Sequence, residues 1–327
     1  MAESVTHSLK DGRTVQEVTL SAYGLTAKIL TLGAVLRDLR LDGHEPPLVL
    51  GFQDVEAYVA NSCFLGAIVG RYANRINEGR TLIDGRPYQL DQNNSAHLLH
   101  GGSDGTWAQN WQITALSHDQ VTLGCTLPDG HMGFPGKLNI ACQYSLLPNA
   151  MLDIQLSATT DQITLCNLAP HSYFNLDGST QIKDHTLEIF ADSYVPVDGA
   201  GIPTGGTRKV ANNRHDFRAP RPANATELDV SYCFDTDAKT LRDNARLTSI
   251  SSGRTLTVRS NQPGLQVFNA PQMVTDANGL NRTPYGPYCG IAFEPQIWPD
   301  APNQPDFPDA HLHPGETYLN HCQFAFD

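Results

Sequence analysis

The sequence lacks the short motifs that indicate a nucleotide-binding site or a metalloprotease zinc site. It contains neither a Gly-x-Gly-x-x-Gly fingerprint nor a Walker loop, and it has no His-Glu-x-x-His pair. The first two motifs hold phosphates against backbone N–H groups, and the third holds zinc between two histidines. The absence of the first two argues against a nucleotide cofactor.

Basic residues are scarce relative to acidic ones. The 327 residues include 22 Lys and Arg against 34 Asp and Glu, which gives a formal net charge of −12. Such a surface repels the phosphates of nucleic acids and of anionic membranes. We therefore expect no nucleic-acid partner and no membrane partner. A phosphorylated or strongly acidic ligand is also disfavoured, unless basic residues gather locally.

Signals for secretion, membrane spanning and disulfide bonding are missing as well. The first residues lack a basic and an apolar region, and no apolar run approaches the length of a membrane span. The seven cysteines include no Cys-x-x-Cys pair, and their number is odd. Reduced, mostly buried thiols are typical of a cytoplasmic protein. We predict a cytoplasmic protein.

The main pattern in the sequence is an alternation of apolar and polar residues. A period of two is typical of strands that bury one face. This pattern predicts strands at residues 15–21, 25–30, 35–41, 121–127, 138–144, 151–157, 162–168, 185–191 and 254–260. Turn signals such as Asp42-Gly43 and Asp177-Gly178 separate them.

Helical signals are few, and we expect only short turns at residues 54–58 and 237–243. Strands joined by short turns rather than by long helices argue against βαβ units. The pattern predicts an all-β protein, a large antiparallel sandwich. Because no linker divides the chain, residues 1–327 are expected to form a single domain. The Pro- and Asp-rich stretch 295–314 is expected to be an ordered loop or a surface flap.

A first polar cluster occurs in the segment Gly70-Arg71-Tyr72-Ala73-Asn74-Arg75-Ile76. Two arginines four residues apart, beside an asparagine, suit a sugar-like or carboxylate ligand. For the segment taken alone, a solvated loop or a structural ion pair is the simpler explanation.

Two histidines, His97 and His100, flank a pair of leucines and precede Gly101-Gly102. The glycines allow close approach of the backbone to a ligand or a positive φ, and histidine titrates near neutrality. Either histidine could instead be structural. A zinc site with His311 and His313 is a further alternative, but no Cys or carboxylate stands at a matching spacing. We therefore predict no metal site.

A third histidine, His171, begins the stretch His-Ser-Tyr-Phe-Asn. In a strand, His171, Tyr173 and Asn175 would project to one face, because side chains alternate. Three polar groups on one face predict a lined pocket, although an exposed sheet face would show the same pattern.

The carboxylate of Glu294 lies between the apolar run that starts at Tyr288 and Pro295. A carboxylate at the end of a buried strand is costly unless it is paired. Its pKa is then expected to rise toward the range that is useful for a base. An ordinary glutamate in a salt bridge is the alternative.

Taken together and in this order, these motifs resemble those of the aldose 1-epimerase family, the galactose mutarotases. The matching segments span most of the chain, at residues 70–76, 99–102, 171–176, 263–268, 293–308 and 314–316. The resemblance implies a β-supersandwich with few short helices. It also implies interconversion of the α and β anomers of free aldoses, with no metal and no organic cofactor.

The resemblance further implies the roles of individual residues. Glu294 matches the family's base, His171 its acid, and His100 a histidine near the ring oxygen of the sugar. The positions that match substrate-binding residues are Asn74, Arg75, Asp229 and Gln266. The family often has His-Asn after that aspartate, whereas this chain has Val230-Ser231, a departure that bears on sugar preference. His97 matches no family role and is expected to be structural.

The implied reaction needs one base and one acid at the same hemiacetal. On this hypothesis Glu294 takes the proton of the C1 hydroxyl, while protonated His171 serves the ring oxygen. We expect a monosaccharide as the partner and a monomer or homodimer as the assembly. Two alternatives remain, a hexose-phosphate mutarotase and a non-catalytic sugar-binding protein. The first needs a cluster of cations, and the second should have lost the acid or the base.

Overall fold

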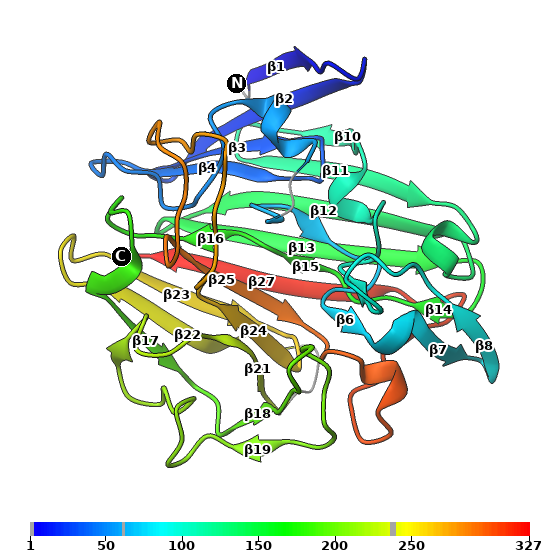
Figure 1. Cartoon of the computed structure of the whole chain (residues 1–327). Coiled ribbons are helices and arrows are strands. Elements are labelled where there is room, and N and C mark those ends of the chain that lie inside the picture. Colours follow the sequence, from blue (N-terminus) through cyan, green and yellow to red (C-terminus); the bar gives the residue numbers. More distant parts are fainter. Residues whose placement is uncertain (1–2, 61–62, 236–239) are drawn as a thin grey trace.

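The computed structural model describes residues 3–60, 63–235 and 240–327. Within these ranges the regular structure is almost entirely β, as Figure 1 shows. The helices found there are short 3-10 turns: η1 (Val55–Tyr58), η2 (Asn77–Gly79), η3 (Thr106–Ala108), η4 (His131–Gly133), η5 (Ile182–Asp184) and η6 (Ala301–Asn303). None of the described helices is long and apolar enough to cross a membrane.

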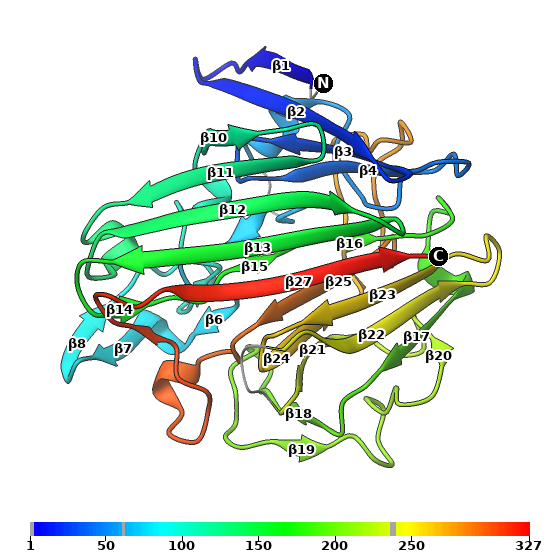
Figure 2. The same ribbon diagram turned by 180° about the vertical axis from the view of Figure 1, so that it is seen from behind.

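The largest sheet has nine antiparallel strands. In Figure 2 this sheet lies in front of the others. Their order across the sheet is β10 (Gln112–Leu116), β11 (Gln120–Leu127), β12 (Leu138–Leu147), β13 (Met151–Thr160), β27 (Tyr318–Phe326), β23 (Thr255–Ser260), β22 (Arg242–Ser249), β17 (His185–Ile189) and β20 (Arg221–Pro222). The last strand of the chain, β27, therefore pairs with β13 and β23 in the middle of the sheet.

A second sheet of six strands packs against the other face of the first (Figures 1 and 2). Its order is β16 (Tyr173–Phe174), β25 (Ile291–Gln296), β24 (Gly264–Phe268), β21 (Asp229–Cys233), β18 (Ser193–Val195) and β19 (Arg208–Lys209). The core joins the two sheets, since the ring of Phe174 in β16 lies 4.9 Å from that of Phe324 in β27. This is the predicted sandwich.

The remaining strands form smaller sheets. Four of them build an antiparallel sheet near the N-terminus: β1 (Glu3–Ser8), β2 (Thr14–Ala22), β3 (Leu25–Leu30) and β4 (Leu36–Leu41). The others form two-stranded pairs: β5 (Ile68–Val69) with β15 (Ala169–Pro170), β6 (Arg75–Ile76) with β9 (Leu98–Leu99), β7 (Arg80–Ile83) with β8 (Arg86–Gln89), and β14 (Thr164–Leu165) with β26 (His311–Leu312).

Side-chain alternation in the six-stranded sheet explains where its polar residues point. In β25, Ile291 and Phe293 belong to the core between the sheets. Glu294 therefore projects from the opposite, outer face. The register sets Glu294 beside Gln266 of β24, so the side chains of both residues lie on that outer face. By the same alternation Asp229 of β21 lies there too, because Val230 belongs to the core.

Most of the predicted strands are confirmed, with boundaries shifted by a few residues. The prediction for 162–168 was too long, because only Thr164–Leu165 forms a strand there. The turn at 54–58 is confirmed as η1, which the Asp54 side chain caps by accepting the N–H of Glu56. The turn at 237–243 lies partly outside the described residues, and its last two residues belong to strand β22. The stretch 295–314 is ordered, and contains η6 and β26.

Candidate active site

A cavity of about 250 Å³ lies on the outer face of the six-stranded sheet. It contains six of the seven predicted site residues, all except Gln266. The residues that line it are Cys63, Phe64, Asn74, Arg75, Leu99, His100, His171, Tyr173, Asp229, Phe268, Gln272, Met273 and Glu294. Residues from segments that are distant in sequence therefore meet at one place, as an active site requires.

The shortest contact between an acid and a base in the cavity joins His171 and Glu294. The imidazole Nε2 lies 3.6 Å from the carboxyl Oε1, and both residues are buried. Glu294 comes from β25, and His171 from the link between β15 and β16. The other polar atom of each group, Nδ1 of His171 and Oε2 of Glu294, is buried without a hydrogen-bond partner. Buried polar atoms are normally hydrogen-bonded, so these two atoms are open to a ligand bound in the cavity.

Burial opposes a charge on either member of this pair. It lowers the pKa of His171 to about 4. It raises the pKa of Glu294 well above the ordinary value, with a further rise from Asp229 and an opposing effect of Arg75. Burial therefore favours the neutral form of each group, the protonated carboxyl and the uncharged imidazole. The ionised pair, a carboxylate and an imidazolium, has the same number of protons as the neutral pair. Transfer of one proton from Glu294 to His171 therefore converts the neutral pair into the ionised pair.

The neighbouring imidazole of His100 is oriented by the backbone of Asn74. The backbone N–H of Asn74 donates to Nδ1 of His100 over 3.1 Å, and the N–H of His100 donates to the carbonyl of Asn74 over 3.0 Å. Because Nδ1 accepts, the ring proton of the neutral imidazole must be on Nε2. The pKa of His100 is lowered by burial, with further lowering by His171 and Arg75. His100 is thus a neutral hydrogen-bond donor in the cavity.

The backbone at His100 needs the glycine that follows it. Its own φ is +50°, and that of Gly101 is +85°. A Cβ atom at position 101 would lie only 1.8 Å from the carbonyl oxygen of Gly70. The chain therefore passes the segment 70–75 closely, which brings His100 beside Asn74 and Arg75.

A guanidinium and a carboxylate stand at the mouth of the cavity. Arg75 lies 3.9 Å from Asp229 and donates from Nε to the side chain of Asn94 over 3.3 Å. Gln266 does not line the cavity, but its amide donates to the other oxygen of Asp229. The structure thus places Gln266 where it holds Asp229, and not in the cavity wall.

Other residues singled out in the sequence also lie outside the cavity. Arg71 is buried and donates to the carbonyls of Pro135 and Gly136, each over 2.9 Å. His97 accepts the backbone N–H of Glu78. The expectation that Asn175 faces the same pocket as His171 was wrong. Its amide donates to two backbone carbonyls, those of Ser179 and Cys289, because strand pairing in β16 ends at residue 174.

Several wall residues were not expected from the sequence, among them Phe64, Phe268, Gln272 and Met273. Phe268 ends β24, two residues after Gln266, so alternation within that strand could have indicated it. Phe64, Gln272 and Met273 lie in irregular segments. No periodicity or motif marks such positions.

The cluster of His100, His171 and Glu294 was also tested as a metal site. Their ligand atoms lie within 4.8 Å of one another, and no other group of this kind occurs among the described residues. A histidine that binds a metal normally donates from its other ring nitrogen. Nδ1 of His100 instead accepts the N–H of Asn74. The cluster is therefore better suited to moving protons than to holding a cation.

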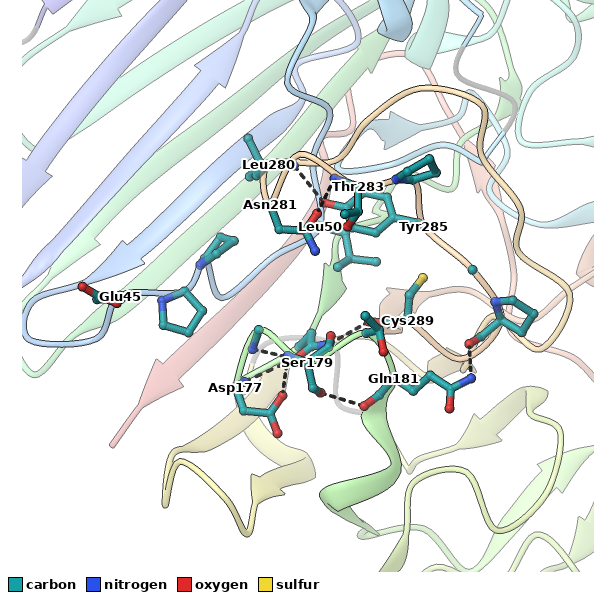
Figure 3. Close-up of a pocket in the computed structure, with 18 of the residues that line it drawn as sticks. Glu45, Leu50, Asp177, Ser179, Gln181, Leu280, Asn281, Thr283, Tyr285 and Cys289 are labelled. Carbon is teal, nitrogen blue, oxygen red and sulfur yellow. Dashed lines mark hydrogen bonds between the residues drawn. The ribbon is translucent and has the colours of Figure 1, made fainter.

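A larger cavity of about 600 Å³ lies among loops next to the end of β16 and the start of β25, and Figure 3 shows residues that line it. Its polar groups bond to one another or to backbone. Ser179 donates to the carbonyl of Gln181 over 2.7 Å, and Gln181 donates to that of Pro287 over 3.2 Å. Its carboxylate Asp177 accepts the hydroxyl of Ser251. Asp177 also lies 3.8 Å from Nδ1 of His185, a residue that does not line the cavity. Among the described residues that do line it, no acid is in contact with a base.

Comparison with known proteins gives consistent matches. A sequence model of the family described as aldose 1-epimerase matches residues 16–325. The chain is 36% identical to galactose mutarotase of Mus musculus, covering 96% of this chain and 95% of the relative. It is 32% identical to aldose 1-epimerase of Escherichia coli K12, covering 97% and 96%. Among solved structures, an aldose epimerase homologue from C. elegans superposes with a TM-score of 0.89 at 29% identity, covering 100% of this chain and 99% of the other.

Proposed function

This chain belongs to the aldose 1-epimerase family and is an isomerase, and we propose that it interconverts the α and β anomers of free aldohexoses such as galactose and glucose. The observation that carries the proposal is the buried pair of His171 and Glu294, 3.6 Å apart in a cavity. The substrate class is a free monosaccharide. Among the described residues that line the cavity, Arg75 is the only lysine or arginine, which disfavours a phosphorylated sugar.

The spacing of the pair suits the opening of a hemiacetal. The reaction removes a proton from the C1 hydroxyl and delivers one to the ring oxygen, and both oxygens are bonded to the same carbon. Their two partners must therefore lie close to each other, as Nε2 of His171 and Oε1 of Glu294 do. Rotation about the C1–C2 bond and closure on the other face give the second anomer. On closure each group takes back the proton state in which it began.

Burial of Glu294 and His171 affects which protonation state of the pair is favoured during the reaction. The reactive state has a Glu294 carboxylate and a His171 imidazolium. After the carboxylate has taken the hydroxyl proton and the imidazolium has given one to the ring oxygen, both side chains are neutral. Burial favours this neutral state, since it raises the pKa of Glu294 and lowers that of His171. The buried site therefore favours the protonation state that accompanies the open-chain sugar.

The other residues bind and orient the sugar. His100 donates from Nε2 to the ring oxygen as negative charge develops on it. Arg75 and Asp229 bind ring hydroxyls at the mouth of the cavity, and Asn74 holds both His100 and the backbone of Arg75. Gln266 acts on the sugar through Asp229.

Optical rotation tests the proposal. Freshly dissolved α-D-galactose and α-D-glucose should reach equilibrium rotation much faster with the protein than without it. Glucose 6-phosphate should show little acceleration. A preference for the phosphate would indicate a hexose-phosphate mutarotase instead. Saturable sugar binding without faster mutarotation would indicate a binding protein.

A further inference from the structure

An unusual backbone conformation occurs at Phe64, in the wall of the proposed catalytic cavity. Its φ is +55°, in the left-handed region. That region is unfavourable for a bulky side chain, so the surrounding structure must hold Phe64 there. Phe64 belongs to no motif, and no role has so far been given to it.

Main-chain contacts fix the segment 63–67 to the segment that carries His171. The N–H of Gly66 donates to the carbonyl of His171 over 3.1 Å, and the N–H of His171 donates to that of Ala67 over 2.9 Å. On the other side, the hydroxyl of Tyr173 donates to the carbonyl of Cys63 over 3.1 Å. The position of the Phe64 ring therefore depends directly on the segment that positions His171.

The phenyl ring contacts both imidazoles of the cavity. Its centroid lies 4.6 Å from that of His100, in an edge-on arrangement, and 5.8 Å from that of His171. Trp107 supports it from behind, edge-on at 5.3 Å. The two imidazoles lie 5.2 Å apart and nearly perpendicular, at 84°. A rigid flat group that touches both rings can hold this mutual geometry.

We propose that Phe64 is a positioning residue, which fixes the orientation of His100 and His171 and keeps water from their rings. The inference rests on the proposed function, because it concerns the same two imidazoles. A sugar bound in the cavity would meet two nitrogen atoms already set at one angle to each other. Without the ring, both imidazoles gain rotational freedom and a route for water. Their basicity would then be set by water as well as by neighbouring groups, which are Glu294, Arg75, Asp229, Tyr173 and Cys63.

The test compares substitutions that differ in the ring alone. Phe64→Leu keeps an apolar side chain at the same backbone position but removes the flat ring, and Phe64→Tyr keeps the ring. Tyr23→Leu is the matched control, because Tyr23 is an exposed aromatic residue with φ +51° in a turn after β2. Steady-state kinetics with α-D-galactose and ring-nitrogen NMR titration of the histidines are measured for each, with circular dichroism to confirm folding.

We expect Phe64→Leu to lower kcat by about 10- to 100-fold with KM changed less than about threefold. Phe64→Tyr should restore most of kcat, and Tyr23→Leu should match the unsubstituted protein. The pKa of His171, which burial holds at about 4, should rise in Phe64→Leu.

Two results would overturn the inference. An increase in KM with kcat unchanged would make the ring a surface for the sugar and not for the histidines. Unchanged kcat with unchanged histidine titrations would leave Phe64 without this role. If the unsubstituted protein fails to accelerate mutarotation of any aldose, the proposed function fails, while the NMR titrations still decide whether Phe64 controls the two rings.

Discussion

Two cavities of this sandwich, the loop cavity and the cavity beside Glu294, differ in chemistry more than in size. The loop cavity of Figure 3 has about 600 Å³, and the cavity beside Glu294 has about 250 Å³. In the larger one, side chains such as those of Ser179 and Gln181 are bonded to nearby carbonyls. In the smaller one, atoms of His171 and Glu294 are buried without partners.

The hydrogen bonding of buried polar side chains, and not the volume, distinguishes the two cavities. Leaving a buried polar atom unpaired costs free energy of unfolding, about 1–3 kcal/mol for each group. Unpaired atoms alone do not mark a site, since others, such as Nε of Arg71, are buried outside both cavities. In the smaller cavity they belong to an acid and a base that are in contact. The loop cavity has no such cost among the groups named above, and we assign it no role. The contrast can be tested by making the same kinds of substitution in both cavities.

The largest effect is expected from Glu294→Gln. The amide has nearly the shape of the carboxyl group but cannot take the hydroxyl proton, so turnover of α-D-galactose should fall by about 10²–10⁴-fold. Polarimetry at equal concentrations of folded protein measures the loss. Glu45→Gln, the same change in the loop cavity, is the control and should leave turnover unchanged. Near-normal turnover in Glu294→Gln would remove that residue from the mechanism.

A smaller loss is expected from His100→Asn. Asparagine tolerates the left-handed backbone found at this position, but it is too short to supply the donor that His100 presents in the cavity. Loss of one such donor costs about 10²-fold in kcat. His97→Asn changes the neighbouring histidine, outside the cavity, and should retain full kcat. Equal activities of the two variants would contradict the role of His100.

Stability should depend on pH through His171. Its pKa is about 4 in the folded protein, against an ordinary value of 6.5. As pH falls from 6.5 toward 4, the unfolded chain binds a proton that the folded protein does not, and the free energy of unfolding declines by about 3 kcal/mol. His171→Asn should lack this part of the decline. Denaturant unfolding at pH 4, 5, 6.5 and 8 measures the difference between the two proteins, and parallel curves would show that burial does not suppress the charge.

The smallest effect is expected in the loop cavity. Ser179→Ala removes a hydroxyl that donates to a nearby carbonyl at an exposed position. The free energy of unfolding should change by less than about 0.5 kcal/mol, as for most surface substitutions. Turnover should not change. A clear loss of turnover would mean that the larger cavity takes part in the reaction after all.

The sequence predicted the strands well because their alternation records one buried face, and it failed where local geometry decides. The prediction for Asn175 was wrong because β16 ends after Phe174, so alternation does not continue to the next residue. Gln266, a predicted substrate-binding residue, donates from its amide to Asp229 and does not line the cavity itself. Neither the end of strand β16 nor the hydrogen bond of the Gln266 amide can be predicted from the spacing of residues.

The candidate site was predicted residue by residue only through family resemblance. Spacing alone could not show that His171 and Glu294, more than a hundred positions apart, would meet. Phe64 could not be predicted at all, since its importance comes from a positive φ and from contacts with two histidines. Such features depend on the folded backbone and not on a pattern of residue types.

The most direct measurement is a double-variant cycle in which Glu294→Gln and His171→Asn are compared singly and together for turnover of α-D-galactose. If both groups act on one hemiacetal, removing either one already abolishes the contribution of the other to turnover. The double variant should then be no more than a few-fold slower than the slower single variant. Losses that multiply in the double variant would mean that the two residues act independently, and would contradict the paired mechanism.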